Sequence, residues 1–161
     1  MKTRFLSLIF TCLLLFPFLS NAQTVKVSGE VTSPFTIDAA SFNQFTHVSQ
    51  TRKDRDGLNH TYTGVALSEI LKKAGTTMDS ALKGENLTKY LLVEASDGYQ
   101  IIFSLAELDK SFTDQVIILA DTIDGKPLAT GDGPYRVIVP NDKKPARCAK
   151  QVVGLRVMFA K

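Results

Sequence analysis

Tryptophan is absent from this 161-residue sequence, and cysteine and histidine occur only twice each. Two cysteines exclude a small domain held together by several disulfides. Two histidines are too few for an obvious histidine-rich metal site. The sequence also lacks the CxxC, HExxH, GxGxxG and GxSxG motifs and a Walker phosphate-binding loop. It therefore carries no motif for the common zinc, dinucleotide, nucleotide or serine-hydrolase chemistries.

The composition is that of an ordinary globular domain. Apolar residues make up 44% of the chain and charged residues 22%, with a net charge of +3. These values exclude collagen, a coiled coil and a disordered acidic tail. The length allows one domain, or two small ones at most.

The first 22 residues have the three-part pattern of a secretory signal peptide. They open with two basic residues, continue almost wholly apolar through Leu19, and end with Ser20 and Ala22 as small residues before a cleavage site. The apolar run is too short for a typical membrane-spanning helix; the alternative is an uncleaved N-terminal anchor. We expect residues 1–22 to be the signal peptide and residues 23–161 to be the domain.

Cleavage at this position changes the properties of the chain. The mature protein would have 139 residues and a net charge of +1, because Lys2 and Arg4 leave with the signal. We expect an exported protein, periplasmic or secreted, with no stable membrane span. A charge of +1 gives no basic footprint for nucleic acid. Cys12 is also removed, so Cys148 would be a lone thiol, either buried and inert or a reactive or pairing site.

Short apolar runs predict six or seven strands with two or three short helices, an α+β pattern in one domain. The Asp-Gly pairs at residues 56–57 and 97–98 predict hairpin turns. A continuous apolar run at residues 116–120 predicts a strand buried on both faces. The other expected strands span residues 25–31, 47–50, 90–95, 100–103, 135–139 and 152–159.

The clearest helical pattern spans residues 64–75. Starting from Leu67, apolar residues recur at i, i+3, i+4 and i+7, which forms one buried face. Gly75 is a suitable residue to end this helix. Ser104 and Glu107 have the spacing of a capping box, which predicts a second, short helix after them.

Positive charge is concentrated in residues 136–150, where five basic residues face one acidic residue and the local charge is +4. The basic residues are Arg136, Lys143, Lys144, Arg147 and Lys150. A loop with two arginines and three lysines suits an oxyanion or a phosphate; the alternative is a solvated charged loop. Residues 54–57 resemble a truncated calcium loop, but the third acidic position and the closing glutamate are missing.

Four sequence blocks support a family resemblance. Residues 62–75 resemble the pattern W/Y-x-G-V-x-L-x-x-L-L-x-x-A-G, and residues 94–99 resemble an A-x-D-G-Y hairpin. Residues 125–128 and 133–140 resemble G-x-P-L followed by G-x-P-x-R-x-x-V-P, and residues 146–150 resemble A-R-x-x-K. In this order, the blocks resemble sulfite oxidase-like molybdopterin-binding domains, and above all their small exported stand-alone members.

The resemblance implies an α+β fold in which a single compact domain surrounds a mixed, partly barrel-like β-sheet with a few short helices. It implies molybdopterin as the cofactor. On the matching positions, Arg136, Arg147 and Lys150 would hold the phosphate of the pterin and neighbouring polar groups.

The sequence departs from the catalytic members at one position. Those members carry a cysteine upstream of the first block, and its thiolate binds molybdenum. Residues 47–52 contain no cysteine, and Cys148 lies in a different block. We therefore expect no catalytic or metal-ligating residue. Our preferred interpretation is a non-catalytic exported domain that binds a pterin or another anionic small molecule. Two alternatives stay open: a molybdopterin-dependent oxidoreductase with an envelope redox partner, and an envelope interaction domain with a vestigial pocket.

Overall fold

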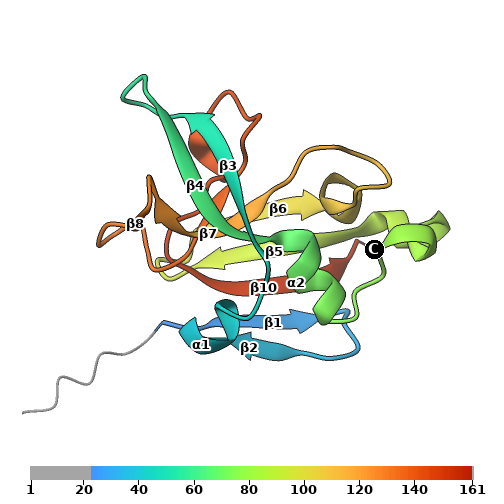
Figure 1. Ribbon diagram of the computed structural model, residues 1–161. Helices are drawn as coiled ribbons and strands as arrows, with labels where there is room; N and C mark the ends of the chain where they lie inside the picture. The colour runs from blue at the N-terminus through green and yellow to red at the C-terminus, as the bar shows by residue number, and fades with distance from the viewer. Residues whose placement is uncertain (1–22, 161) are drawn as a thin grey trace, which may run out of the picture.

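The computed structural model describes residues 23–160, which form ten strands, two short α-helices and four 3₁₀ helices (Figure 1). The expected signal peptide and Cys12 lie outside the described residues. Within this range, no helix combines the length and the apolar character needed to cross a bilayer.

Five strands form the first sheet, sheet A, in the order β2-β1-β10-β5-β6. β1 and β10 are parallel and the other pairs are antiparallel, so the sheet is mixed as expected. Its strands are β1 (Val25–Gly29), β2 (Phe35–Ile37), β5 (Lys89–Ala95), β6 (Gln100–Ser104) and β10 (Val152–Phe159).

The second sheet, sheet B, is antiparallel throughout. Its order is β3-β4-β7-β8, and β9 also pairs with β7. Its strands are β3 (His47–Lys53), β4 (Asn59–Ala66), β7 (Ile118–Ile123), β8 (Lys126–Pro127) and β9 (Arg136–Ile138). Across residues 23–160 neither sheet closes on itself. The far end of the β3–β4 hairpin extends beyond the body of the domain (Figure 1).

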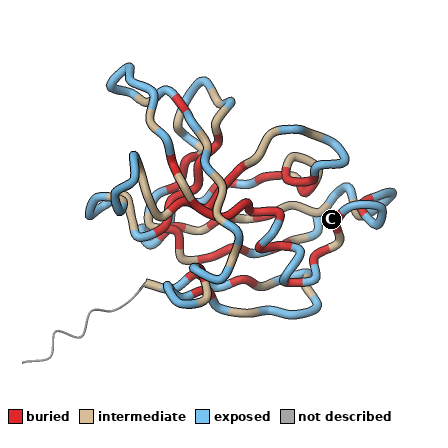
Figure 2. Tube along the Cα trace, viewed as in Figure 1, coloured by how far each residue is buried: buried red, intermediate tan, exposed pale blue. Residues whose placement is uncertain are grey.

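The helices are short, and the longest of them closes the core. Leu67, Ile70 and Leu71 of α2 are fully buried, as is Ala74 just after it. They pack with apolar residues of both sheets in one main cluster, and buried residues gather where these elements meet (Figure 2). The helices are α1 (Ala39–Phe42), α2 (Leu67–Lys73) and 3₁₀ helices at Asp79–Ala81, Gly84–Thr88, Leu105–Leu108 and Pro145–Arg147.

The strand predicted at residues 116–120 is confirmed as β7, which begins two residues later and is buried on both faces. Leu119 faces the main core, whereas Ile118 and Ala120 lie in a second cluster with Tyr62 on the opposite face of sheet B. The capping box is also confirmed. The Ser104 side chain accepts a bond from the Glu107 amide, and a 3₁₀ helix follows.

One predicted boundary and one predicted burial pattern are wrong, although the last strand has the predicted bounds of residues 152–159. The helix predicted from Gly64 begins at Leu67, because residues 64–66 pair with β7 and their backbone groups are already used in the sheet. In the last strand, a register shift between Val152 and Gly154 breaks the expected alternation, so Val152 is buried and Val153 is half-buried. Three strands are not among those expected: β2 and β8 span only three and two residues, and the end of the eight-residue β4 lies in the range predicted as helix.

Candidate functional site

A cleft lies between the turn of the β3–β4 hairpin and the segment that leads into β10. It consists of two neighbouring cavities of about 250 Å³ each. Both are lined by Arg55, Pro145, Cys148 and Lys150. We call this pair of cavities the cleft. The hairpin turn predicted at Asp-Gly and the basic loop predicted from charge thus meet at one place.

Arg136 is the most buried cation that lines the cleft, with 7% of its surface exposed. Its Nη1 donates to the Tyr62 hydroxyl and to an oxygen of Asp132, each at 3.1 Å. Its Nε is buried and has no hydrogen-bond partner within residues 23–160. Lys150 Nζ contacts the other oxygen of Asp132 at 2.5 Å. Asp132 therefore holds Arg136 and Lys150 side by side.

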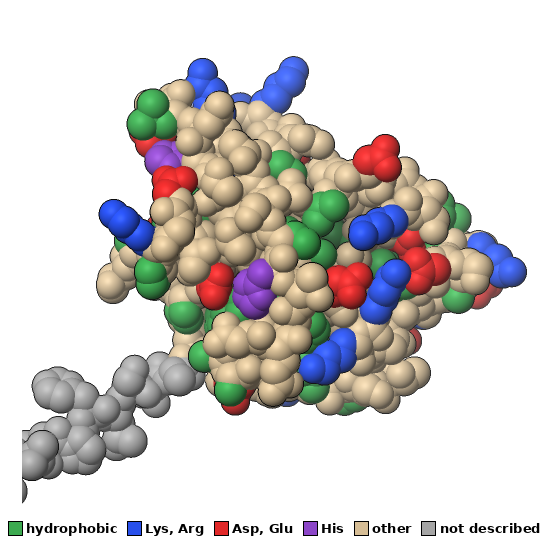
Figure 3. Space-filling view, viewed as in Figure 1, with side chains coloured by type: hydrophobic (Ala, Val, Ile, Leu, Met, Phe, Trp, Pro, Cys, Tyr) green, Lys and Arg blue, Asp and Glu red, His purple; other side chains and the backbone are tan. Residues whose placement is uncertain are grey.

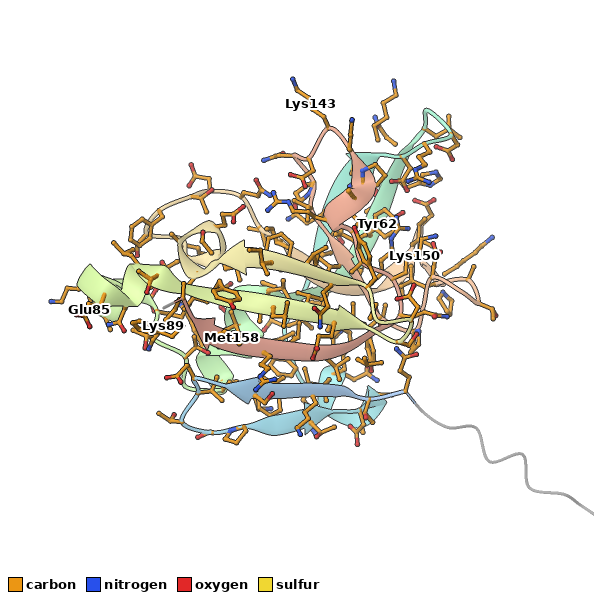
Figure 4. The ribbon with its side chains drawn as sticks, turned by 180° about the vertical axis from the view of Figure 1, so that it is seen from behind. Tyr62, Glu85, Lys89, Lys143, Lys150 and Met158 are labelled. Atoms are coloured by element: carbon orange, nitrogen blue, oxygen red, sulfur yellow. The ribbon has the colours of Figure 1, made fainter. Side chains whose placement is uncertain are left out.

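Tyr62 connects this group to a second buried pair. Its hydroxyl donates to Asp54, whose other oxygen lies 2.9 Å from Nε of Arg52. Burial and the Asp54 acceptor together raise the pKa of Tyr62, so the phenol stays protonated at neutral pH. These contacts form one chain in which cations and carboxylates are joined through the neutral Tyr62. Its members are Arg52, Asp54, Tyr62, Arg136, Asp132 and Lys150. Figure 4 shows Tyr62 and Lys150 on the same side of the domain, with Lys143 at the outer end of its loop.

Arg147, the third predicted binding residue, lines neither cavity of the cleft. Its guanidinium makes two bonds of 2.8 Å to Asp142 and one of 2.8 Å to Glu107, and it lies 4.9 Å from the ring centre of Phe103. The bond to Arg147 lowers the pKa of Asp142. These contacts anchor the basic loop to the 3₁₀ helix at Leu105–Leu108.

Cys148 is a free thiol at the floor of the cleft, with 4% of its surface exposed. Its sulfur accepts bonds from Nη1 of Arg52 at 2.7 Å and from the backbone amide of Val139 at 3.4 Å. The burial expected for an inert cysteine is therefore observed. Both donors, one from β3 and one from the residue after β9, hold the sulfur in place at the floor of the cleft.

The charge count along the sequence overstated the positive field at this site. The window of residues 136–150 contains one acidic residue, but Asp132, Glu107 and Asp54 come from outside it and pair with its cations or their neighbours. On the face drawn in Figure 3, Lys and Arg side chains are likewise interspersed with Asp and Glu.

Sequence reasoning missed Asp132, Tyr62 and Arg52 as members of the site. Tyr62 belongs to the first family-like block, residues 62–75, but the block pattern alone does not predict that its hydroxyl joins the site. The acidic residues of the hairpin turn were read as a weak calcium loop, whereas Asp54 binds Arg52 and Tyr62. Within the part of the chain that the structure describes, no cluster of three or more acidic, cysteine or histidine side chains could hold a metal ion.

His60 lies beside the cleft between two carboxylates. Its Nδ1 is 2.6 Å from Asp124 and its Nε2 is 2.8 Å from Asp56, a residue of the cleft lining. The bonds to Asp124 and Asp56, in that order, raise the pKa of His60 from 6.5 to about 9. The charged form is therefore favoured in the folded state.

We expect this contact to make stability depend on pH. A raised folded-state pKa gives stabilisation that is full below pH 6.5 and is lost as the pH rises to about 9. A His60→Gln variant should be less stable than the wild type at pH 6 and equal to it at pH 10. Urea unfolding at both values measures this. If the wild type and the variant differ in free energy of unfolding by the same amount at pH 10 as at pH 6, then packing, not charge, accounts for the difference.

The fold agrees with the comparisons with known proteins. Residues 17–160 match the family model of the oxidoreductase molybdopterin binding domain. The chain therefore belongs to this family.

Among solved structures, the sulfane dehydrogenase SoxCD from Paracoccus pantotrophus is similar, with a TM-score of 0.66 and 21% sequence identity. The match covers 84% of this chain and 38% of that one, so the chain spans well under half of that protein. At this identity the likeness supports the fold alone. No curated protein matches the chain.

The residues of the cleft fit part of a molybdopterin. Arg136, with its unpartnered Nε, and the half-exposed Lys150 suit a phosphate, because guanidinium and ammonium groups form strong bonds to phosphate oxygens. The cleft carboxylates suit N–H groups of a pterin ring. The soft sulfur of Cys148 lines the cleft but is 4% exposed and already accepts two hydrogen bonds, from Arg52 and from the Val139 amide.

Proposed function

We propose that the cleft binds a pterin or another small anionic ligand and does so without cysteine-ligated molybdenum. Arg136 and Lys150 would contact the anionic group. Arg147, which the family pattern also assigns to the cofactor, would act by holding the loop that carries Lys150. The observation that carries this proposal is the buried Arg136 with an unpartnered Nε, fixed beside Lys150 by a shared Asp132.

The arrangement suits a ligand that replaces an internal contact. Lys150 is exposed, and its ammonium group is held by Asp132 at 2.5 Å. An arriving phosphate or carboxylate would share this ammonium and draw on the partly unsatisfied guanidinium of Arg136. Molybdopterin, when bound, would bring the sulfur ligands of its own metal; molybdenum held by those ligands alone belongs to the oxidoreductase alternative and not to the function proposed.

Titration with pterin-6-carboxylate, an anionic fluorescent probe, tests this proposal. We expect Lys150→Ala to weaken binding about tenfold, the effect of losing one charged hydrogen bond. Lys143→Ala removes the same charge from the exposed end of the same loop and should change binding less than about twofold.

Three results would contradict the proposal. They are no binding of the probe, equal losses in the Lys150 and Lys143 variants, and equal affinity for uncharged pterin. The first of these would favour a vestigial pocket. Arg136→Gln provides a second variant, and circular dichroism of each variant confirms that it is folded.

We also propose that the domain is exported, on the evidence of the signal pattern in residues 1–22. Mass spectrometry of the protein recovered from the exported fraction should find Gln23 at or within a few residues of its N-terminus. Recovery of an intact Met1 in the cytoplasmic fraction alone would contradict export.

A further inference from the structure

A third cavity, separate from the cleft, lies where α1 meets β7 and the segment that follows β8. Its volume is about 250 Å³, and it shares no lining residue with the cleft. Its walls are mainly apolar and aromatic, and the main ones are formed by Phe42, Pro127, Leu128, Pro134 and Tyr135.

One charged side chain lines this cavity. Asp121, at the centre of β7, is half-buried, and its Oδ1 is fully buried without a hydrogen-bond partner in residues 23–160. An unpaired buried oxygen of this kind is costly, and native proteins usually supply it with a donor. No Lys or Arg is among the described residues of the lining. The cavity therefore combines an unsatisfied anion with an apolar wall.

The groups around Asp121 leave its charge largely uncompensated. His47 is the nearby basic group, and its ring packs edge-on against Phe42 at 5.1 Å while Nδ1 contacts the Phe45 carbonyl at 3.0 Å. Asp38, at the start of α1, adds a second carboxylate near Tyr135. Burial raises the pKa of the Asp121 carboxyl, and the Coulombic influence of His47 opposes this. A cation in the cavity would favour the ionised form in the same way.

We propose that this cavity is a second binding site and that it takes a small organic cation, with an ammonium group beside Asp121 and an apolar body against Tyr135. Phe42 and Tyr135, whose ring centres lie 4.9 Å apart, form the aromatic part of the wall. Aromatic faces attract ammonium groups as well as apolar surface. The volume limits the ligand to a fragment-sized molecule, because pockets for drug-sized ligands begin at about 300 Å³.

Benzylammonium is a suitable probe, and benzyl alcohol is its neutral counterpart of nearly equal shape. In a ¹⁵N NMR titration of the wild type at pH 7, we expect benzylammonium to shift the amides of Leu128 and Tyr135 in a saturable way. Benzyl alcohol should bind at least tenfold more weakly. This comparison needs no substitution, so it does not depend on the folding of a variant.

Two variants test the role of the carboxylate. Asp121→Asn should weaken benzylammonium binding at least tenfold, whereas Asp114→Asn removes a charge at an exposed position and should leave it within about twofold. No saturable shift, equal binding of the alcohol, an unchanged affinity in Asp121→Asn, or shifts confined to the cleft would each overturn the proposal. The cleft probe should bind Asp121→Asn normally, so the two sites can be judged separately.

Discussion

Replacement of Arg52 by Ala should lower the free energy of unfolding by about 3 kcal/mol, the lower end of the effect of removing one partner of a buried ion pair, because Asp54 is half-buried. Arg52 is 4% exposed and lies 2.9 Å from Asp54. It also donates to the Val139 carbonyl at 3.1 Å and to the Cys148 sulfur. Without it, the Asp54 carboxylate keeps the Tyr62 hydroxyl within residues 23–160, the Val139 carbonyl loses the Arg52 donor, and the Cys148 sulfur keeps the Val139 amide.

Urea unfolding followed by circular dichroism measures this effect, and Lys53→Ala is the matched control. Lys53 is the next residue of β3 and is exposed, so its loss should change stability by less than about 0.5 kcal/mol. In a double-mutant cycle with Asp54→Asn, the two substitutions should not be additive. A loss below about 1 kcal/mol for Arg52→Ala, or additive effects, would mean that the pair does not organise the cleft floor.

Substitution of Gly64 by Ala should be the second severe change, with a loss of about 3 kcal/mol or more. A Cβ at this position would lie 2.1 Å from the Leu119 carbonyl oxygen and 2.5 Å from the Ala120 Cα. Both are backbone atoms of β7, so no side chain can rotate to make room. β4 and β7 would have to separate at the register shift between Thr63 and Gly64.

Thermal unfolding of Gly64→Ala measures this loss. Gly57→Ala is an informative comparison, because no atom lies within 4 Å of the added Cβ and only its positive φ of 84° opposes the change. It should therefore be milder than Gly64→Ala, at about 1 kcal/mol. Equal stability of Gly64→Ala and the wild type would show that the two strands are not as close as described.

The glycine of the first family block thus has a physical reason. In the sequence, Gly64 looked like the start of a helix, because the apolar period that begins at Leu67 is strong. The residues just before Leu67 pair instead with β7, which lies more than fifty residues later in the chain. A local pattern carries no information about such a partner, so the helix face could be predicted but its first residue could not.

The site shows the same limit. Arg136 and Lys150 could be predicted as neighbours because both belong to recognised blocks and their charges are close along the chain. The contacts of Arg147 with Asp142 and Glu107 could not be predicted, because the fold brings Glu107 to Arg147 from a distant part of the chain. Likewise, the neutralising role of Asp132 depends on its position between two cations that approach it from different segments.

Family membership and side-chain geometry therefore lead to different expectations. The family is named for molybdopterin binding, and the cleft of this chain holds three cations, Arg55, Arg136 and Lys150, that could contact an anionic group. The lone described thiol, however, belongs to a different sequence block from the family's metal-binding cysteine and is held in a buried contact with Arg52. The two expectations differ in one measurable respect, which is whether molybdenum accompanies the bound pterin.

The most direct measurement is the pterin and molybdenum content of the processed protein, purified from the exported fraction. We predict pterin bound with far less than one equivalent of molybdenum, and its loss in the Lys150→Ala variant but not in Lys143→Ala. Stoichiometric molybdenum would contradict this account in favour of an oxidoreductase. The absence of both pterin and metal, together with failure of the anionic probe to bind, would contradict it in favour of a vestigial pocket.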